Sequence, residues 1–214
     1  LAYSAIGQMK RERADINKAA TTFWTPTLIA QTTTENLQAR NLNVTIMHNF
    51  GIATTNVVRN FFGLDNVQNV RLGLDYGLTD RWSIGIGRSS QLNVVDLRSK
   101  FTVMRQKTDG SHPLSITLKG DLGIVTQENR QPLRDDIGTL MSTIVSRKVS
   151  DRLSLQISPM YAYFSSVQPT QQNHLFAIGT GSRFRISDRM ALIAEYYPVI
   201  GNRNPGTNNA FSLG

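Results

Sequence analysis

The sequence predicts an all-β protein, an antiparallel up-and-down β-barrel that spans a membrane. Three observations lead to this fold class. Apolar and polar residues alternate with a period of two from residue 41 onward. The alternating segments have the length of tilted membrane strands, and the connections between them sort by length into two groups. Helical periodicity is absent after residue 20.

The composition limits the class of protein. The chain has 214 residues, enough for one sizeable domain or barrel, and no cysteine, so it depends on no disulfide, zinc thiolate or Cys nucleophile. Its formal net charge of +8 fits either ordinary solubility or an anionic partner. No apolar stretch approaches the roughly 18–20 residues that a transmembrane helix needs, whereas a barrel strand is apolar on one side only.

The start of the chain differs from the rest. The stretch GQMKRERADINKAA shows no strand alternation, and no apolar core typical of a signal peptide accompanies it. We predict that residues 1–22 form an N-terminal arm or plug segment, which either enters the lumen or lies in the periplasm. Residues 23–214 are predicted to form the barrel domain.

About ten segments show the strand pattern. In LNVTIMHNF (42–50), Leu42, Val44 and Ile46 share one face; in WSIGIG (82–87), the apolar residues alternate with serine and glycine. The other predicted strands are 70–78, 94–104, 113–125, 139–149, 153–163, 176–186, 190–199 and one that begins at 210–214.

The polar faces of these strands indicate a lumen. They are rich in Gly and Ser with isolated charges, whereas the wet face of a soluble sandwich usually carries Lys, Glu and Thr. Six basic and three acidic residues, with a sum of +3, are predicted to face the lumen. They would form ion pairs in a narrow barrel or favour anions in a wider one. These residues are Arg71, Asp75, Arg98, Lys100, Lys119, Asp121, Arg183, Arg185 and Glu195.

Aromatic residues lie close to the ends of the apolar faces, as at the two interfaces of a membrane barrel. Core aromatics of a soluble sandwich would show the same placement, so this feature alone decides nothing. The predicted interfacial residues are Tyr76, Trp82, Tyr161, Tyr163 and Tyr196.

One five-residue pattern occurs three times, as LTDRW (78–82), VSDRL (149–153) and ISDRM (186–190). Each copy lies between two alternating runs, where hydroxyl and Asp side chains suit a tight hairpin turn. Counted along the chain, all three fall at one end of the sheet, and most long connections fall at the other. Outer-membrane barrels have this asymmetry of short periplasmic turns and long outer loops, whereas a Greek-key sandwich does not.

The run FFGLDNVQNVRLGLDYGLTDRWSIGIGRSS (61–90) resembles the DUF5777 family of β-barrel proteins of Bacteroidota. Segments 25–37, 147–156 and 194–201 resemble the family too, so that the resemblance covers roughly residues 23–214. It implies an outer-membrane barrel of about 12 strands when complete, of which about 10 lie in this chain. We therefore expect that the last strand pair is missing from this sequence or that a partner covers the open edge. The resemblance implies no particular chemistry.

The sequence predicts no enzyme. It has three scattered histidines and neither an HExxH motif nor a P-loop, so we expect no catalytic residue, no metal site and no cofactor. The predicted function is a narrow channel or transporter for small polar or anionic solutes, located in the outer membrane of a Gram-negative cell envelope. The alternative is a non-transporting scaffold subunit of a larger outer-membrane or envelope complex. A soluble β-sandwich binding module and an outer-membrane hydrolase rank third and fourth.

The expected partners follow from this location. They are the lipid bilayer and lipopolysaccharide, with other outer-membrane or periplasmic proteins as further candidates. No nucleic-acid partner is expected.

Overall fold

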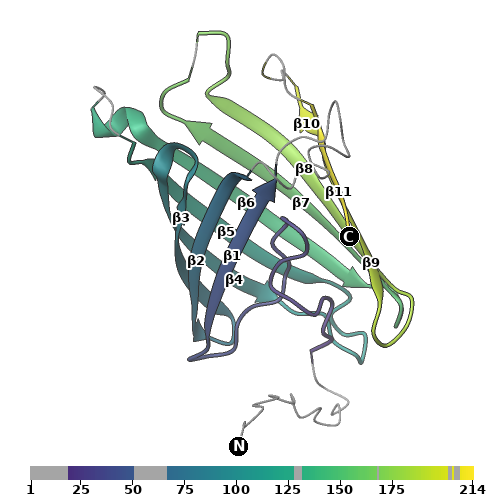
Figure 1. Ribbon diagram of the computed structural model, residues 1–214. Coiled ribbons are helices and arrows are strands. Elements are labelled where there is room, and N and C mark those ends of the chain that lie inside the picture. Colours follow the sequence, from purple (N-terminus) through teal and green to yellow (C-terminus); the bar gives the residue numbers. More distant parts are fainter. Residues whose placement is uncertain (1–18, 51–66, 128–131, 168, 202–203, 205–207) are drawn as a thin grey trace, which may run out of the picture.

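The computed structural model describes residues 19–50, 67–127, 132–167, 169–201, 204 and 208–214, and its regular structure is almost entirely β (Figure 1). The strands are β1 (Leu42–Phe50), β2 (Val67–Thr79), β3 (Trp82–Ser89), β4 (Val94–Met104), β5 (Ser115–Val125), β6 (Ile137–Lys148), β7 (Leu153–Phe164), β8 (His174–Arg185), β9 (Ala191–Tyr197), β10 (Val199–Ile200) and β11 (Ala210–Leu213). Two short 3-10 turns, η2 (Gln91–Asn93) and η3 (Leu133–Asp136), lie in connections. No helix in this part of the chain is long and apolar enough to cross a membrane.

Apart from the short β10, every strand pairs antiparallel with the next one along the chain, in the order β1-β2-β3-β4-β5-β6-β7-β8-β9-β11. The short β10 pairs with β8 because it continues the line of β9 after Pro198, which has no N–H for the ladder. The all-β, antiparallel, up-and-down prediction is confirmed. The sheet curves strongly, and no pairing between β1 and β11 occurs in the described ranges (Figure 1).

The period-two pattern decides which side chains face outward. On β2, Leu72 and Leu74 are 54% and 46% exposed, and Gly73 between them is buried. On β7, Leu155 and Ile157 are exposed and Ser154 and Gln156 are buried. Leaving such an apolar surface in water would be costly, whereas a lipid environment matches it.

The inner side of the sheet is polar. In the described part of the chain, Phe23 and Ile144 are the buried hydrophobic residues, whereas fifteen polar or charged residues are buried. Many are hydroxyl-bearing residues that bond to each other, such as Thr102 and Thr117 at 3.1 Å between their Oγ1 atoms. The molecule therefore has its apolar surface outside and its polar core inside.

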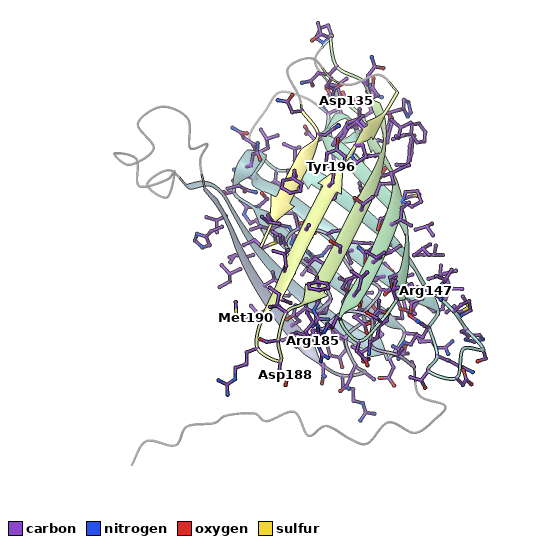
Figure 2. All side chains as sticks on the ribbon, turned by 90° about the vertical axis from the view of Figure 1, so that its right-hand side faces the viewer. Asp135, Arg147, Arg185, Asp188, Met190 and Tyr196 are labelled. Atoms are coloured by element: carbon purple, nitrogen blue, oxygen red, sulfur yellow. The ribbon has the colours of Figure 1, made fainter. Side chains whose placement is uncertain are left out.

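The three copies of the repeated pattern form tight turns at the end of the sheet opposite η3 (Figure 1). In the first, Thr79 Oγ1 accepts hydrogen bonds from the backbone N–H groups of Arg81 and Trp82, at 3.2 and 3.0 Å. In the second, Ser150 Oγ does the same for residues 152 and 153. Figure 2 shows Asp188 of the third turn at one end of the molecule and Asp135 of η3 at the other. We call these the turn end and the loop end.

Candidate functional site

Residues 22–37 lie inside the curve of the sheet, and the first wall strand begins only at Leu42 (Figure 1). We call residues 22–37 the interior segment. Phe23 and Thr33 in this segment are 0% exposed, and Thr34 is 4% exposed. The segment therefore fills part of the space that the wall encloses.

The interior segment overlaps both ranges into which the sequence was divided. An arm or plug was predicted at 1–22 and the barrel domain from residue 23. Of the predicted arm, only residues 19–22 are described, and the rest lies outside the described residues. The interior segment begins at Thr22 and continues through the threonine-rich stretch TTTEN (32–36), and the strands of the wall follow from Leu42.

The middle of the interior segment is a small hairpin. Thr27 and Thr32 form an antiparallel bridge, and the N–H of Leu28 donates to the carbonyl of Gln31 at 2.8 Å. The tip at residues 28–31 turns within four residues, and so the N–H groups that follow Leu28 point away from the hairpin. These amides need partners from elsewhere, because an unpaired buried N–H is costly.

Glu195 on β9 supplies those partners. Its carboxylate is 1% exposed and accepts hydrogen bonds from the backbone N–H groups of three consecutive residues. The donors are Ile29 at 2.8 Å, Ala30 at 3.1 Å and Gln31 at 3.0 Å. The hydroxyl of Tyr197 donates a fourth bond, at 3.2 Å. Bonds to a charged acceptor are stronger than neutral ones, so Glu195 is the main attachment of the hairpin tip to the wall.

The neighbouring strand β8 carries glycines where the hairpin tip approaches. A Cβ atom at Gly179 would lie 2.3 Å from the Gln31 side-chain nitrogen, and one at Gly181 would lie 2.5 Å from the Gln31 side-chain oxygen. The glycines therefore make the room that the Gln31 amide occupies. Since strand glycine is otherwise unfavourable, this close approach explains its use here.

The end of the interior segment that is closer to the turn end is also bound to the wall. Thr34 Oγ1 and Ser146 Oγ lie 2.5 Å apart, and the Asn36 amide donates to Thr102 Oγ1 at 2.9 Å. The ammonium of Lys100 donates to the backbone carbonyl of Glu35. These contacts fix the segment to β4 and β6.

The Glu35 carboxylate folds back on its own segment. It accepts hydrogen bonds from the N–H groups of Thr22 at 2.8 Å and Phe23 at 3.2 Å. Burial raises the pKa of the Glu35 carboxyl above its ordinary value, and the two amide donors and the Lys100 ammonium lower it in part. Ionised Glu35 is therefore less favourable in the folded protein than in the unfolded chain.

A second group of charges lies on the inner faces of β2 to β5. Arg71 and Asp96 are 2.6 Å apart, Arg98 and Asp75 are 3.0 Å apart, and Arg98 also approaches Asp96 at 3.5 Å. Lys119 and Asp121 form a further pair. We call these six side chains the charge cluster. It contains three basic and three acidic groups and is electrically balanced.

The charge cluster borders a polar cavity of about 340 Å³. Thr27, Ala30 and Thr32 of the hairpin line one side of this cavity, and all six members of the charge cluster line it too. A space of this size holds several waters or one small polar solute.

The remaining predicted charges lie elsewhere on the inner side. The Arg183 guanidinium carbon lies 3.4 Å from the centroid of the Trp24 ring, a cation–π contact with the interior segment. Arg185 lies at the turn end, 3.8 Å from Asp188 (Figure 2). Lys100 and Glu195 contact the interior segment, so the nine predicted residues do not form one site.

The structure places the five predicted aromatics on the outer face. Tyr76 and Trp82 are near the turn end, and the Trp82 indole N–H donates to Ser99 Oγ at 3.0 Å. Tyr161 and Tyr163 on β7 both contact His174 near the loop end. Tyr196 lies on β9 (Figure 2). Polar tips on apolar bodies suit the membrane interfaces.

Sequence reasoning missed two acidic members of the interior. Asp96 holds both Arg71 and Arg98, and its signal was present, because Asp96 lies two residues before Arg98 on the same strand face. Glu35 had no such signal, since it lies outside the alternating segments. With these two added to the nine predicted residues, there are six basic and five acidic groups, a sum of +1.

Metal ligands do not gather in this interior. Across the described part of the chain, no three His, Asp or Glu side chains come together in a way that could hold a metal ion. What the arrangement can do is hold a segment inside the barrel through hydrogen bonds and leave a polar cavity beside it.

Comparison with known proteins identifies the type of domain. The family model described as a membrane bound beta barrel domain, DUF5777, matches residues 23–214. This range includes all of the interior segment except Thr22, and all the described strands of the wall. A search of curated proteins and a search of solved structures each returned no match.

Proposed function

Because this chain belongs to the DUF5777 family of membrane-bound β-barrel domains, we propose that it acts as a gated passage for small polar solutes. The interior segment is the gate. It closes the lumen at rest, and solutes pass when it leaves its place on the wall.

The way in which the interior segment is held carries the proposal. Its contacts with the wall are mainly hydrogen bonds to Glu195, Ser146 and Thr102, and Phe23 is its one fully buried apolar residue. Polar contacts can be exchanged for contacts with water at a small net cost, whereas moving an apolar plug would expose apolar surface. A segment held in this way can move without unfolding the wall.

The charges of the interior bear on which solutes would pass. The prediction of anion preference rested on a sum of +3, which Asp96 and Glu35 reduce to +1. The charge cluster is also internally paired. We therefore propose small polar solutes without a strong preference for one sign of charge.

The outer membrane is the proposed location, with lipid and lipopolysaccharide around the apolar outer face. The support is the asymmetry of the connections, with the three tight turns at one end, together with the longer connection 105–114, and η3 and most of the longer loops at the other. We propose no enzymatic activity and no nucleic-acid partner. Other outer-membrane or periplasmic proteins remain candidate partners at the ends of the sheet.

The alternative is a non-transporting scaffold subunit of a larger envelope complex. The close fit of the interior segment favours it, because a wall filled in this way needs no passage to be stable. In that case the interior segment would serve as a permanent core.

Conductance separates the two functions. The full chain is inserted into a planar bilayer beside Glu195→Ala, which removes the acceptor of three amides, and Asp151→Ala, which removes an exposed carboxylate at the turn end. The gate predicts little current from the wild type and from Asp151→Ala, and steady current from Glu195→Ala. Absence of current from all three correctly folded proteins would favour the scaffold.

A further inference from the structure

A second cavity lies on the inner side of β4, β5, β6 and β7 near the loop end. Its volume is about 350 Å³. No residue of the interior segment lines it, and Asp96 and Asp121 at its base separate it from the polar cavity. It is therefore distinct from the space beside the gate, and it does not depend on gate movement.

Apolar side chains form most of the wall of this cavity. Val94 and Val125 face each other across β4 and β5, and Leu140, Ala162 and Phe164 continue the surface across β6 and β7. Such a lining is unusual on this inner side, where hydroxyl, glycine and charged residues dominate. A concave apolar surface inside a polar lumen suits the apolar body of a small ligand.

The charged groups of the cavity are all acidic. Asp96 and Asp121 lie at its base, Asp135 and Asp136 lie at its rim, and no lining residue is basic. This is notable in a chain with 23 basic and 15 acidic residues. Arg71, Arg98 and Lys119 contact the two base carboxylates from the neighbouring polar cavity and do not line this one.

One carboxylate oxygen at the base has no partner of its own. Asp121 Oδ2 contacts the Lys119 ammonium, whereas Asp121 Oδ1 is buried and accepts no hydrogen bond in the described part of the structure. A buried acceptor without a donor is costly, so a donor from a ligand would be favourable here.

We propose that this cavity binds a small amphiphilic organic cation from the loop end. The ligand has one ammonium or amidinium group on an aromatic or aliphatic body. The cationic group lies beside the carboxylates of Asp96 and Asp121 at the base, and the body lies against the apolar surface of β4 to β7. The rim aspartates attract the cation to the opening. Figure 2 shows the position of Asp135 at the loop end.

The test uses the full chain in lipid nanodiscs, with empty nanodiscs to subtract partition into lipid. Three probes share one ring system: 1-naphthylmethylammonium, 1-naphthalenemethanol and 1-naphthoate. Equilibrium dialysis measures their binding. The proposal expects the cation to bind about tenfold more tightly than the alcohol, the gain typical of a hydrogen bond to a charged group, and the carboxylate most weakly. Equal binding of all three probes would overturn it.

Two matched variants locate the bound cation. Leu140→Trp fills the cavity, whereas Met141→Trp places the same side chain on the outer face, where residue 141 is 62% exposed. The first is expected to abolish cation binding and the second to leave it unchanged. Asp121→Asn removes the charge at the same size, and is expected to lower cation binding about tenfold without affecting the alcohol. Unchanged cation binding in Leu140→Trp, or in Asp121→Asn if the former does not fold, would place the cation elsewhere and overturn the proposal.

Discussion

Charged groups on the two halves of the inner face find their hydrogen-bond partners in different ways. On β2 to β5, the side chains of the charge cluster pair with one another, as Arg71 and Arg98 do with Asp96. On β7 to β9, the wall offers small residues and the single carboxylate of Glu195, whose donors come from the interior segment and from Tyr197. The charge cluster is paired without the interior segment, whereas Glu195 is not.

This difference indicates where the interior segment is anchored. Removal of the hairpin would leave the charge cluster paired, but it would leave Glu195 without its three amide donors and Gly179 and Gly181 beside an empty space. The free energy that holds the hairpin tip therefore comes mainly from the side of β8 and β9. Variants on the two halves should have different consequences.

The largest effect is expected for Glu195→Ala. It removes the acceptor of three N–H groups of the hairpin tip, and we expect the free energy of unfolding to fall by about 3 kcal/mol. Glu195→Gln keeps one acceptor oxygen and should lose less. Urea unfolding in detergent micelles, followed by heat-modifiable gel migration, measures the order. Equal stability of Glu195→Ala and wild type would show that the tip is not anchored there.

A smaller effect is expected where the hairpin meets β8. In Gly181→Val, the Cβ atom alone would lie 2.5 Å from the Gln31 side chain and 2.8 Å from Leu28 Cδ1, so the tip must shift. Overpacking of this kind costs about 2 kcal/mol. The control is Gly120→Val, where a Cβ meets no atom within 4 Å. Protease cleavage within residues 22–37 should increase for the first variant and not for the second. An increase for both would contradict a specific contact.

A variant in the charge cluster is expected to lower the stability of the protein without releasing the interior segment. Asp96→Asn removes the charge that faces Arg71 and Arg98, and we expect a loss of about 1–2 kcal/mol in the free energy of unfolding. Because the hairpin is anchored elsewhere, protease cleavage of the interior segment should stay at the wild-type level. Faster cleavage in Asp96→Asn would remove the distinction between the two halves.

The smallest effect concerns pH. Burial raises the pKa of the Glu35 carboxyl, so the folded protein binds this proton more tightly than the unfolded chain, in which the pKa is near its ordinary value of 4.5. Stability relative to Glu35→Gln should be highest below that pH and should fall as the pH rises through the raised pKa. Unfolding by urea at a series of pH values checks this. A stability difference that grows with rising pH would give the wrong sign.

The wall could be predicted from sequence because its signal is local and repeated. Leu72, Gly73 and Leu74 alternate in the sequence and point to opposite sides of the sheet, and ten consecutive wall strands repeat this rule. The assignment of the three turns to one end of the sheet needed only the number of strands between them, because successive strands run in opposite directions. Neither inference required knowledge of long-range contacts.

The interior segment could not be predicted in the same way. The stretch TPTLIAQTTTEN has no period, and its place depends on contacts more than a hundred residues away, such as Ile29 with Glu195 and Thr34 with Ser146. The charge at Glu195 was predicted to face inward, but the sequence offered basic side chains as its expected partners and not three backbone amides. Residue types do not show which backbone N–H groups will act as donors to a distant side chain, because every residue except proline has one.

The claim that the interior segment is a gate can be tested most directly by locking it. The chain has no cysteine, and the side chains of Thr34 and Ser146 touch, so Thr34→Cys with Ser146→Cys would tie the segment to β6. In a Glu195→Ala background, single-channel recording in a planar bilayer is made before and after addition of a reductant. The account predicts little current while the disulfide is intact and steady current after reduction. The same current in both states would contradict it.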